Sequence, residues 1–438
     1  MAKLILVTGA TGYIASRLIP RLLDSGYHVR CLARDPLRLQ GRSWFNQVDI
    51  FQADVTTPES LVHAFDGVDT AYYLIHNMSA GHWYTKIELD GARNFAFAAE
   101  TAGIQHIIYL GGLADPEQHI APHMRSRIET GKVLRAGKVP VTEFRAGVIT
   151  GSGSISFEMI RFMTELFPIV PGPMWMKNKS QPIAVQNVID YLFAALTNPN
   201  GRGGVFEIGG PNITIYGDLM LRYANARGLK RKMFLLPGIP ISLMAFGVGL
   251  MTPVPYPIAY ALIGGLSTDS IVKYPEALKV FPEVKLIDFD SATQKALKIT
   301  HPDHIERVWV DGDSRAKSLK HEGCFIDQRE LRINASLENV FKALELIASK
   351  RNWQIEINEG NTRILVHDQD RRFGKYWAEW RAAPGSLTGK FADLTYLSQT
   401  IFFSPNGLPG FIYWYFSMSF HKVKLGYLIK HTARQIAG

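Results

Sequence analysis

The chain has 438 residues, which predicts two or three domains at about 150 residues per domain. Apolar residues make up 47% and charged residues 20%, a composition that excludes a disordered or collagen-like chain. The 48 basic and 39 acidic side chains leave a net charge of +9. Because the basic residues form no dense run, we do not expect nucleic acid as a partner.

The cysteine content and the first residues indicate the compartment. Cys31 and Cys324 are far apart in sequence, which argues against a disulfide framework and a cysteine-based zinc site. No spacing of His, Asp or Glu indicates any other metal site. The first residues lack the long apolar region of a signal peptide, so we expect a cytoplasmic protein.

Residues 1–300 alternate short apolar runs with helical patterns. This alternation predicts an α/β domain built on a doubly wound parallel sheet of the Rossmann type. Strands are expected at 4–7, 28–32, 49–52, 70–75, 107–110 and 141–144, and helices at 14–23 and 84–101.

A glycine-rich turn directly follows the first of these strands and opens a helix. Gly9 permits a tight turn, Gly12 lets the backbone approach a pyrophosphate, and Ala15 allows close packing of the helix on the strand. Unpaired N–H groups at the start of the helix attract an anion. The pattern predicts a dinucleotide site, with a merely structural turn as the alternative. The residues expected to form the site are Thr8, Gly9, Thr11, Gly12, Tyr13 and Ile14.

The end of the second strand predicts which dinucleotide binds. NAD sites usually carry an acidic residue there, whereas this chain has Ala33 followed by Arg34. A small residue leaves room for a 2′-phosphate, which a guanidinium can hold through two hydrogen bonds, with Arg38 assisting. We therefore expect NADP(H). The alternative is that Arg34 is a surface residue and Asp35 contacts the ribose. Asp54 and Val55, which follow the third strand, are expected to lie beside the adenine.

These segments, with 67–69, 108–112, 144–147 and 204–211, resemble the extended and atypical short-chain dehydrogenase/reductase superfamily, especially NmrA-like members. The resemblance covers about the first 300 residues. It implies reduction by hydride transfer, in which a Tyr gives the proton and a Lys four residues later lowers the pKa of that Tyr. A Ser at the end of the preceding strand completes the family's site.

The sequence departs from this family pattern at all three positions. His123 stands in place of the Tyr, Arg127 in place of the Lys, and Gly111 or Gly112 in place of the Ser. Arg127 can still hold a ribose or phosphate, but it does not lose a proton near neutrality. His123 is a candidate general acid because its ordinary pKa lies near neutral pH. The alternative is a polar residue at a helix start. Further candidate acids near the end of the fourth strand are Tyr72, Tyr73 and His76.

Residues 233–268 contain no charged side chain. Five prolines interrupt this stretch, so a continuous membrane-spanning helix is not expected. The stretch predicts broken apolar helices that form the substrate lobe and either line a pocket or pack against the second domain, with peripheral membrane contact as the alternative.

Residues 301–438 predict a second, smaller α+β domain. A strand at 329–333 precedes a helix with Ser336 as its N-cap, and antiparallel strands and a closing helix at about 408–436 follow. Segments 397–400 and 407–415 resemble an uncharacterised domain that follows such reductases and is similar to the helix-grip fold of polyketide cyclases and START-like lipid carriers. That resemblance implies an apolar cavity, with a plain core as the alternative. Basic residues of the closing segment suit an anionic lipid surface: Lys422, Lys424, Lys430 and Arg434.

Two functions follow from these patterns. The first is an NADPH-dependent reductase of a hydrophobic molecule such as an isoprenoid, polyketide or quinone-like compound. The second is a non-catalytic NADPH sensor, assembly factor or scaffold, which the missing Tyr–Lys pair allows. The sequence indicates neither the substrate nor the oligomeric state.

Overall fold

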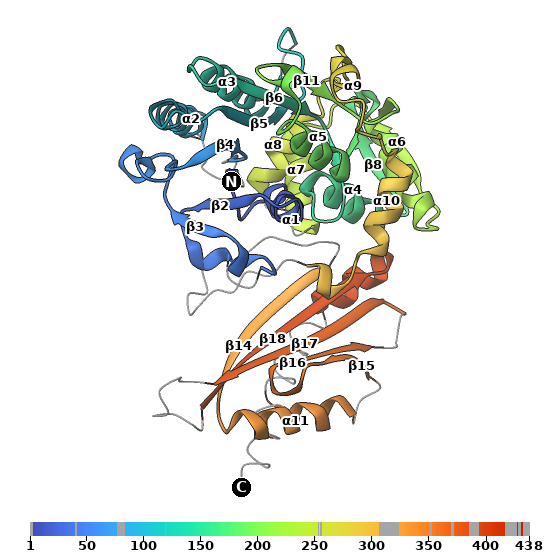
Figure 1. Cartoon of the computed structure of the whole chain (residues 1–438). Coiled ribbons are helices and arrows are strands. Elements are labelled where there is room, and N and C mark those ends of the chain that lie inside the picture. Colours follow the sequence, from blue (N-terminus) through green and yellow to red (C-terminus); the bar gives the residue numbers. More distant parts are fainter. Residues whose placement is uncertain are drawn as a thin grey trace. The chain divides into compact units, whose positions relative to one another are not determined.

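The structure is a computed structural model that describes residues 3–39, 42–76, 84–118, 120–252, 254, 256–305, 324–349, 353–368, 372–384, 394–416, 427 and 431. The described chain forms two compact units, coloured blue to yellow and orange to red in Figure 1. The first unit contains the described residues up to Thr164 and Ile169–Ile299, and the second contains Glu165–Pro168, Thr300–Ile305 and the described residues from Cys324 onward.

A seven-stranded parallel sheet forms the centre of the first unit, in the order β11-β6-β5-β4-β1-β2-β3. Its strands are β1 (Leu4–Thr8), β2 (His28–Ala33), β3 (Asp49–Gln52), β4 (Val68–Tyr73), β5 (His106–Gly112), β6 (Val141–Ala146) and β11 (Val205–Ile208). The predicted Rossmann-type fold is confirmed. Both ends of each of the six predicted strands lie within two residues of their predicted positions. The strand order reverses between β1 and β4, where ligands bind beyond the carboxyl ends of the strands.

Helices cover both faces of this sheet (Figure 1), so successive residues of a strand enter different cores. Ile5 and Val7 pack in the core that contains α1 (Ala15–Asp24) and α5 (Val185–Ala194). Leu6 packs in the opposite core, beneath α2 (Tyr84–Thr101). The small side chains of α2 bring this helix close to the sheet, as its composition predicts: Ala92, Ala96 and Ala99. Next to α2 along the same face lies α3 (Pro122–Arg135).

A helical lobe completes the first unit. It contains α4 (Ile155–Leu166), α6 (Tyr216–Ala226), α7 (Ile241–Met251), α8 (Tyr256–Gly265), α9 (Glu276–Val280) and α10 (Phe289–Lys298). Short strand pairs accompany them: β7 (Ile149–Thr150) with β10 (Ile183–Ala184), β9 (Lys179–Ser180) with β12 (Thr214–Ile215), and β8 (Ile169–Pro173) with β13 (Lys232–Leu236). The uncharged stretch thus forms short broken helices, as predicted. Within the described residues, no helix has the length and apolar character needed to cross a bilayer.

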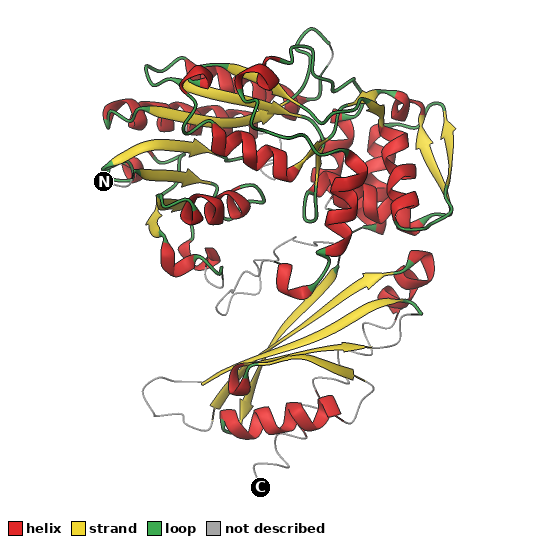
Figure 2. Cartoon of the chain, turned by 45° about the vertical axis from the view of Figure 1, so that its right-hand side comes forward, coloured by secondary structure: helices red, strands yellow, loops and turns green. Residues whose placement is uncertain are grey.

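The second unit is a five-stranded antiparallel sheet, in the order β14-β18-β17-β16-β15, with α11 (Leu337–Ser349) on one face (Figure 2). The strands are β14 (Phe325–Asn334), β15 (Trp353–Asn358), β16 (Arg363–Asp368), β17 (Gly374–Pro384) and β18 (Leu394–Pro405). The predicted N-cap is confirmed, since the Ser336 hydroxyl accepts a hydrogen bond from the Asn339 amide at 3.3 Å. Residues 407–416 are helical, whereas the rest of the predicted closing helix, apart from Tyr427 and His431, lies outside the described residues.

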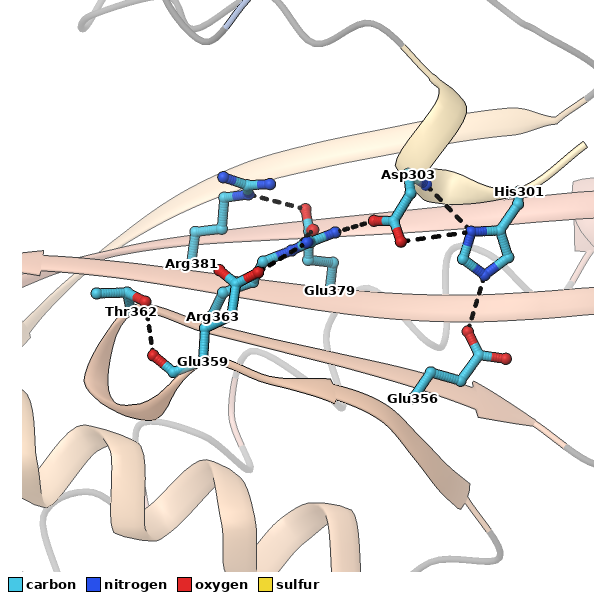
Figure 3. A network of polar contacts seen from close by, with 8 residues as sticks. All are labelled: His301, Asp303, Glu356, Glu359, Thr362, Arg363, Glu379 and Arg381. Atoms are coloured by element: carbon cyan, nitrogen blue, oxygen red, sulfur yellow. Dashed lines mark hydrogen bonds and ion pairs between the residues drawn. The ribbon is translucent and has the colours of Figure 1, made fainter. Parts of the chain in front are cut away.

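Charged side chains form a network on this sheet (Figure 3). Glu379 of β17 is only 1% exposed, and its two carboxylate oxygens face Arg363 at 2.7 Å and Arg381 at 3.3 Å. Arg363 also pairs with Asp303 and Glu359. Burial acts to lower the pKa of Arg363, but the hydrogen bonds to Asp303 and Glu379 outweigh it and raise that pKa. Arg363 therefore keeps its charge although it is buried.

Candidate functional site

The glycine turn after β1 has the shape that the motif predicts. Gly9 has φ +65°, and a Cβ atom there would lie 2.6 Å from the carbonyl oxygen of Leu74, just after β4. The Gly12 amide donates to the Gly9 carbonyl at 2.7 Å, which closes the turn immediately before α1. Only glycine fits this close approach of β1 to β4. The backbone is thus left bare where a pyrophosphate would lie, so the turn fits a dinucleotide.

Of the other residues predicted to bind the dinucleotide at this turn, one is buried in the sheet and three are partly exposed. Thr8 is fully buried, and its hydroxyl donates to the Tyr72 carbonyl at 3.0 Å and accepts from the Leu74 amide at 3.0 Å. Its side chain therefore joins β1 to β4, which leaves only its backbone for a cofactor. The other three residues predicted at the turn are partly exposed: Thr11, Tyr13 and Ile14.

Arg17 is a site residue that the sequence reasoning missed. Its guanidinium lies 4.0 Å from the centre of the Tyr13 ring and donates to the Tyr13 carbonyl at 3.1 Å. It also donates to the carbonyl of Ser152 at 2.9 Å. Arg17 thus joins the phosphate-binding turn to the loop after β7. The only signal in the sequence was the spacing of four residues between Tyr13 and Arg17, which suits a contact across one helical turn.

Two arginines lie after β2, where the adenosine ribose is expected. Arg34 is exposed and directly follows buried Ala33. Arg38 lies in a short 3₁₀ turn, and its buried Nε has no hydrogen-bond partner among the residues that the structure describes. A small residue followed by two guanidiniums suits a 2′-phosphate.

The residues predicted beside the adenine form an ordered loop after β3. The Asp54 carboxylate accepts hydrogen bonds from the Thr56 amide at 2.9 Å and the Thr56 hydroxyl at 2.8 Å. The Val55 carbonyl accepts from the Asn94 side chain at 2.9 Å. A Cβ atom on Gly91 would lie 2.8 Å from a methyl group of Val55, so this loop packs closely on α2.

His123 and Arg127 are one turn apart on α3. His123 is 5% exposed, and its Nδ1 has no hydrogen-bond partner within the described chain. Its ring packs on α8, where a Cβ atom at Gly265 would lie 3.1 Å from Cε1. Burial, followed by the charge of Arg127, lowers the pKa of His123 to about 3. The fold thus moves the pKa of His123 far from its ordinary value, and the ring stays neutral near pH 7; its role as a general acid stays a prediction.

The position of the family's serine is filled by other side chains. A Cβ atom on Gly112 would lie 2.7 Å from Met124 Cε and 3.1 Å from Arg127 Cδ. The Tyr109 hydroxyl donates to the Arg127 carbonyl at 2.9 Å and holds this turn of α3 against β5. The glycine at position 112 thus accommodates the longer residues that this chain carries on α3.

Two of the other candidate acids belong to the core. The Tyr72 hydroxyl donates to the Leu192 carbonyl at 2.8 Å, and Tyr73 packs against Phe95. Burial raises the pKa of both tyrosines, which makes them weaker acids than an exposed tyrosine. His76 lies nearer the site. Burial and then the charge of Arg127 lower its pKa well below the ordinary value.

Glu88 is a further residue that the sequence reasoning missed. It is buried on α2 and accepts a hydrogen bond from Ser126, which directly precedes Arg127 on α3. This contact fixes the two helices beside the predicted catalytic pair. A single acid within a helical pattern carries no signal that distinguishes it from a surface residue.

An apolar cavity of about 640 Å³, including its open part, lies within the helical lobe. Its lining comes mainly from α4, α6, α7 and α8, and five methionines contribute to it. Val148, between β6 and β7, lines the end at the sheet's carboxyl edge, while Ile263 and Leu266 flank the Gly265 contact with His123. The indole Nε1 of Trp175, a lining residue, has no hydrogen-bond partner in the described part of the chain. The prediction of a pocket lined by the uncharged stretch is confirmed.

Comparisons with known proteins agree with this geometry. Residues 1–201 match the model of the NmrA-like family. The chain is also similar in fold to the triphenylmethane reductase of Citrobacter sp., whose structure is complexed with NADP(H). The TM-score is 0.54 at 20% identity, over 66% of this chain and 99% of that one. The likeness shows the fold, a doubly wound parallel sheet of the Rossmann type.

Three curated relatives resemble parts of the chain. Cinnamoyl-CoA reductase 1 of Oryza sativa is 32% identical over 115 residues, which are 24% of this chain and a third (33%) of that protein. The (4-alkanoyl-5-oxo-2,5-dihydrofuran-3-yl)methyl phosphate reductase of Streptomyces griseus is 27% identical over 59% of this chain and 85% of its own. The photosystem II assembly factor Ycf39 of Cyanophora paradoxa is 24% identical over 53% and 71%.

Proposed function

We propose that the protein is an NADPH-dependent reductase of a hydrophobic small molecule, of the isoprenoid, polyketide or quinone-like class. The observation that supports this most is the apolar cavity, which reaches from the carboxyl edge of the sheet to the α8 residues beside His123. Apolar pockets with a few polar groups are typical of small-molecule sites. The relatives that are named reductases favour the same class of reaction.

The dinucleotide supplies a hydride when it is bound. In this proposal the backbone at Gly9 and Gly12 holds the pyrophosphate, and the Arg127 guanidinium holds the ribose or a phosphate. Neutral His123 donates a hydrogen bond from its unpartnered Nδ1 to the substrate oxygen, and the proton that completes the reduction comes from water. Trp175 offers a second donor within the cavity and orients an acceptor atom of the substrate.

A cavity-filling substitution tests the substrate site. We expect Met163→Trp to lower kcat/KM at least about tenfold for any hydrophobic carbonyl or enone compound that the enzyme reduces, because the larger side chain occupies the cavity. NADPH affinity should stay unchanged. The measurement follows the nicotinamide absorbance of purified full-length protein against a panel of such compounds, and Met174→Trp at an exposed position is the matched control.

A cofactor-dependent binding protein without turnover is the second candidate. The absence of the Tyr–Lys pair and the low pKa of His123 favour it, as does the similarity to an assembly factor. Tight NADPH binding without oxidation by any compound, together with unaltered cellular function of His123→Phe, would establish this second function instead of the reductase.

The choice of NADPH over NADH is tested at Arg34. We expect Arg34→Asp to weaken NADPH binding at least about tenfold, because a charge-assisted contact with the 2′-phosphate is lost and a repulsive carboxylate replaces it. NADH affinity should change little. Fluorescence titration with both dinucleotides measures this, with exposed Arg93→Asp on α2 as control. Equal losses for the two dinucleotides contradict the assignment.

For the second unit we infer a helix-grip-like domain that binds a hydrophobic ligand. The order of its elements supports this: a strand, a helix, four antiparallel strands and a helical segment at 407–416. Aromatic side chains of that segment pack on the sheet, with Trp414 stacked on Phe325 and on Phe403.

A further inference from the structure

The outer side of α7 exposes large apolar side chains. Leu243, Phe246 and Leu250 are 59%, 59% and 67% exposed, and their spacing places them along one stripe of the helix. Ala245 and Val248, on the inner side, are buried. The helix is therefore apolar on the side that meets solvent as well as on the side that packs inward.

The next helix continues this surface. α8 exposes Tyr256 and Tyr260, whose ring centres are 6.0 Å apart. A Cβ atom on Gly249 of α7 would lie 3.2 Å from the Tyr256 backbone, so the start of α8 lies directly beside the exposed Leu250. We call this surface the α7–α8 face; its members are Leu243, Phe246, Leu250, Tyr256 and Tyr260.

Positive charge precedes the α7–α8 face in the chain. Residues 227–232 contain four basic side chains and no acidic one, and 233–268 contain no charge at all. Lys230 and Lys232 are exposed. On β13, Lys232 shares its outward side with exposed Phe234 and Leu236, because alternate residues of a strand point the same way. Four residues then lead to α7.

We infer that the α7–α8 face docks on an anionic lipid bilayer, with Lys230 and Lys232 at the headgroups. Protein interfaces carry about one hydrogen bond per 100–200 Å², whereas the exposed stripe of α7 offers Leu and Phe side chains without donors or acceptors. Hydrocarbon needs no such groups, and tyrosines suit the boundary between headgroups and acyl chains. The basic residues complement anionic lipid.

The helices lie on the membrane rather than across it. α7 has 11 residues and α8 has 10, so each is only about 16 Å long against a hydrocarbon core of about 30 Å. Met244 and Val248 of α7 line the cavity. One helix thus separates the docking surface from the cavity, which puts the cavity within reach of molecules dissolved in the bilayer. The docking inference itself does not depend on catalysis.

Vesicle sedimentation tests this inference. We expect the full chain to sediment with phosphatidylcholine vesicles that contain phosphatidylglycerol, and less with phosphatidylcholine alone. Phe246→Ser/Leu250→Ser should weaken binding at least about tenfold, since exposed apolar area is lost. Lys230→Gln and Lys232→Gln should each weaken binding to the anionic vesicles about fivefold. Phe97→Ser on α2, where the side chain is 72% exposed, is the matched control and should bind as the wild type does.

Three outcomes overturn the inference: no binding by the wild type, equal binding by the double variant, or a wild-type dimer that the double variant dissociates in light scattering. The last result assigns the face to a second copy of the chain. NADPH titration of the same samples shows that each variant is folded, and Leu243→Gln provides a second variant if the double variant is not. A failure of docking leaves NADPH binding and turnover, which are measured without vesicles, unaffected.

Discussion

Replacing Glu379 by Gln is expected to lower the free energy of unfolding of the second unit by about 3 kcal/mol. The carboxylate is 1% exposed and faces two guanidiniums, so its neutralisation removes a counter-charge from buried Arg363 and from partly exposed Arg381. Arg363 keeps its contacts with Asp303 and Glu359, which holds the loss near the lower end of the range for a broken buried pair. Because Gln has nearly the same shape as Glu, the substitution leaves no cavity that would add to the loss of stability.

Urea unfolding of the full chain, followed by tryptophan fluorescence, measures this effect, since Trp353, Trp377 and Trp380 all lie in the affected sheet. Glu338→Gln is the matched control. It removes the carboxylate of an exposed pair with Lys342 on α11 and should leave the unfolding midpoint nearly unchanged. Similar small shifts for both variants would contradict a stabilising role for the buried network.

Replacing Gly9 by Ala is expected to abolish cofactor binding, with a loss of affinity of at least about a hundredfold. The new methyl group would lie 2.6 Å from the Leu74 carbonyl oxygen, so β1 and β4 must separate at the switch point. The left-handed backbone at φ +65° adds strain of about 1–2 kcal/mol. The clash with Leu74 and the backbone strain both displace this turn, and the backbone amides that would bind the phosphate move with it.

Gly103→Ala separates strain from contact. Gly103 has φ +69°, close to that of Gly9, but a Cβ atom there meets nothing within 4 Å. We expect this control to lose stability through backbone strain alone and to bind NADPH normally in a fluorescence titration. If Gly9→Ala binds NADPH as Gly103→Ala does, the turn does not hold the dinucleotide.

Periodicity and turn chemistry predicted most of the first unit. The strands and the Gly9 turn follow from residues whose constraints are local, so the sequence carries their signal. The broken helices at 241–265 were likewise predicted from prolines and the absence of charge. Glycine frees the backbone and proline restricts it wherever they occur, independently of what packs around them.

The chemistry of His123 was not predictable in the same way. Its pKa depends on burial against Gly265, which lies over a hundred residues away in the chain, and on the charge of Arg127. Likewise, Tyr72 was a reasonable proton donor by position, but its hydroxyl donates to Leu192 on a distant helix. The buried network of the second unit joins Asp303 to Arg363, sixty residues later. Such properties arise from contacts between residues that no local pattern connects.

The filled space above Gly112 constrains how this chain's chemistry can change. A serine at position 112 would collide with Met124, and its neighbour on α3 is His123 itself. A return to the family's Ser therefore requires the end of the Met124 side chain to turn aside, which is a small movement for a flexible side chain. Homologues with a serine at this position are expected to carry a different side chain or rotamer at position 124.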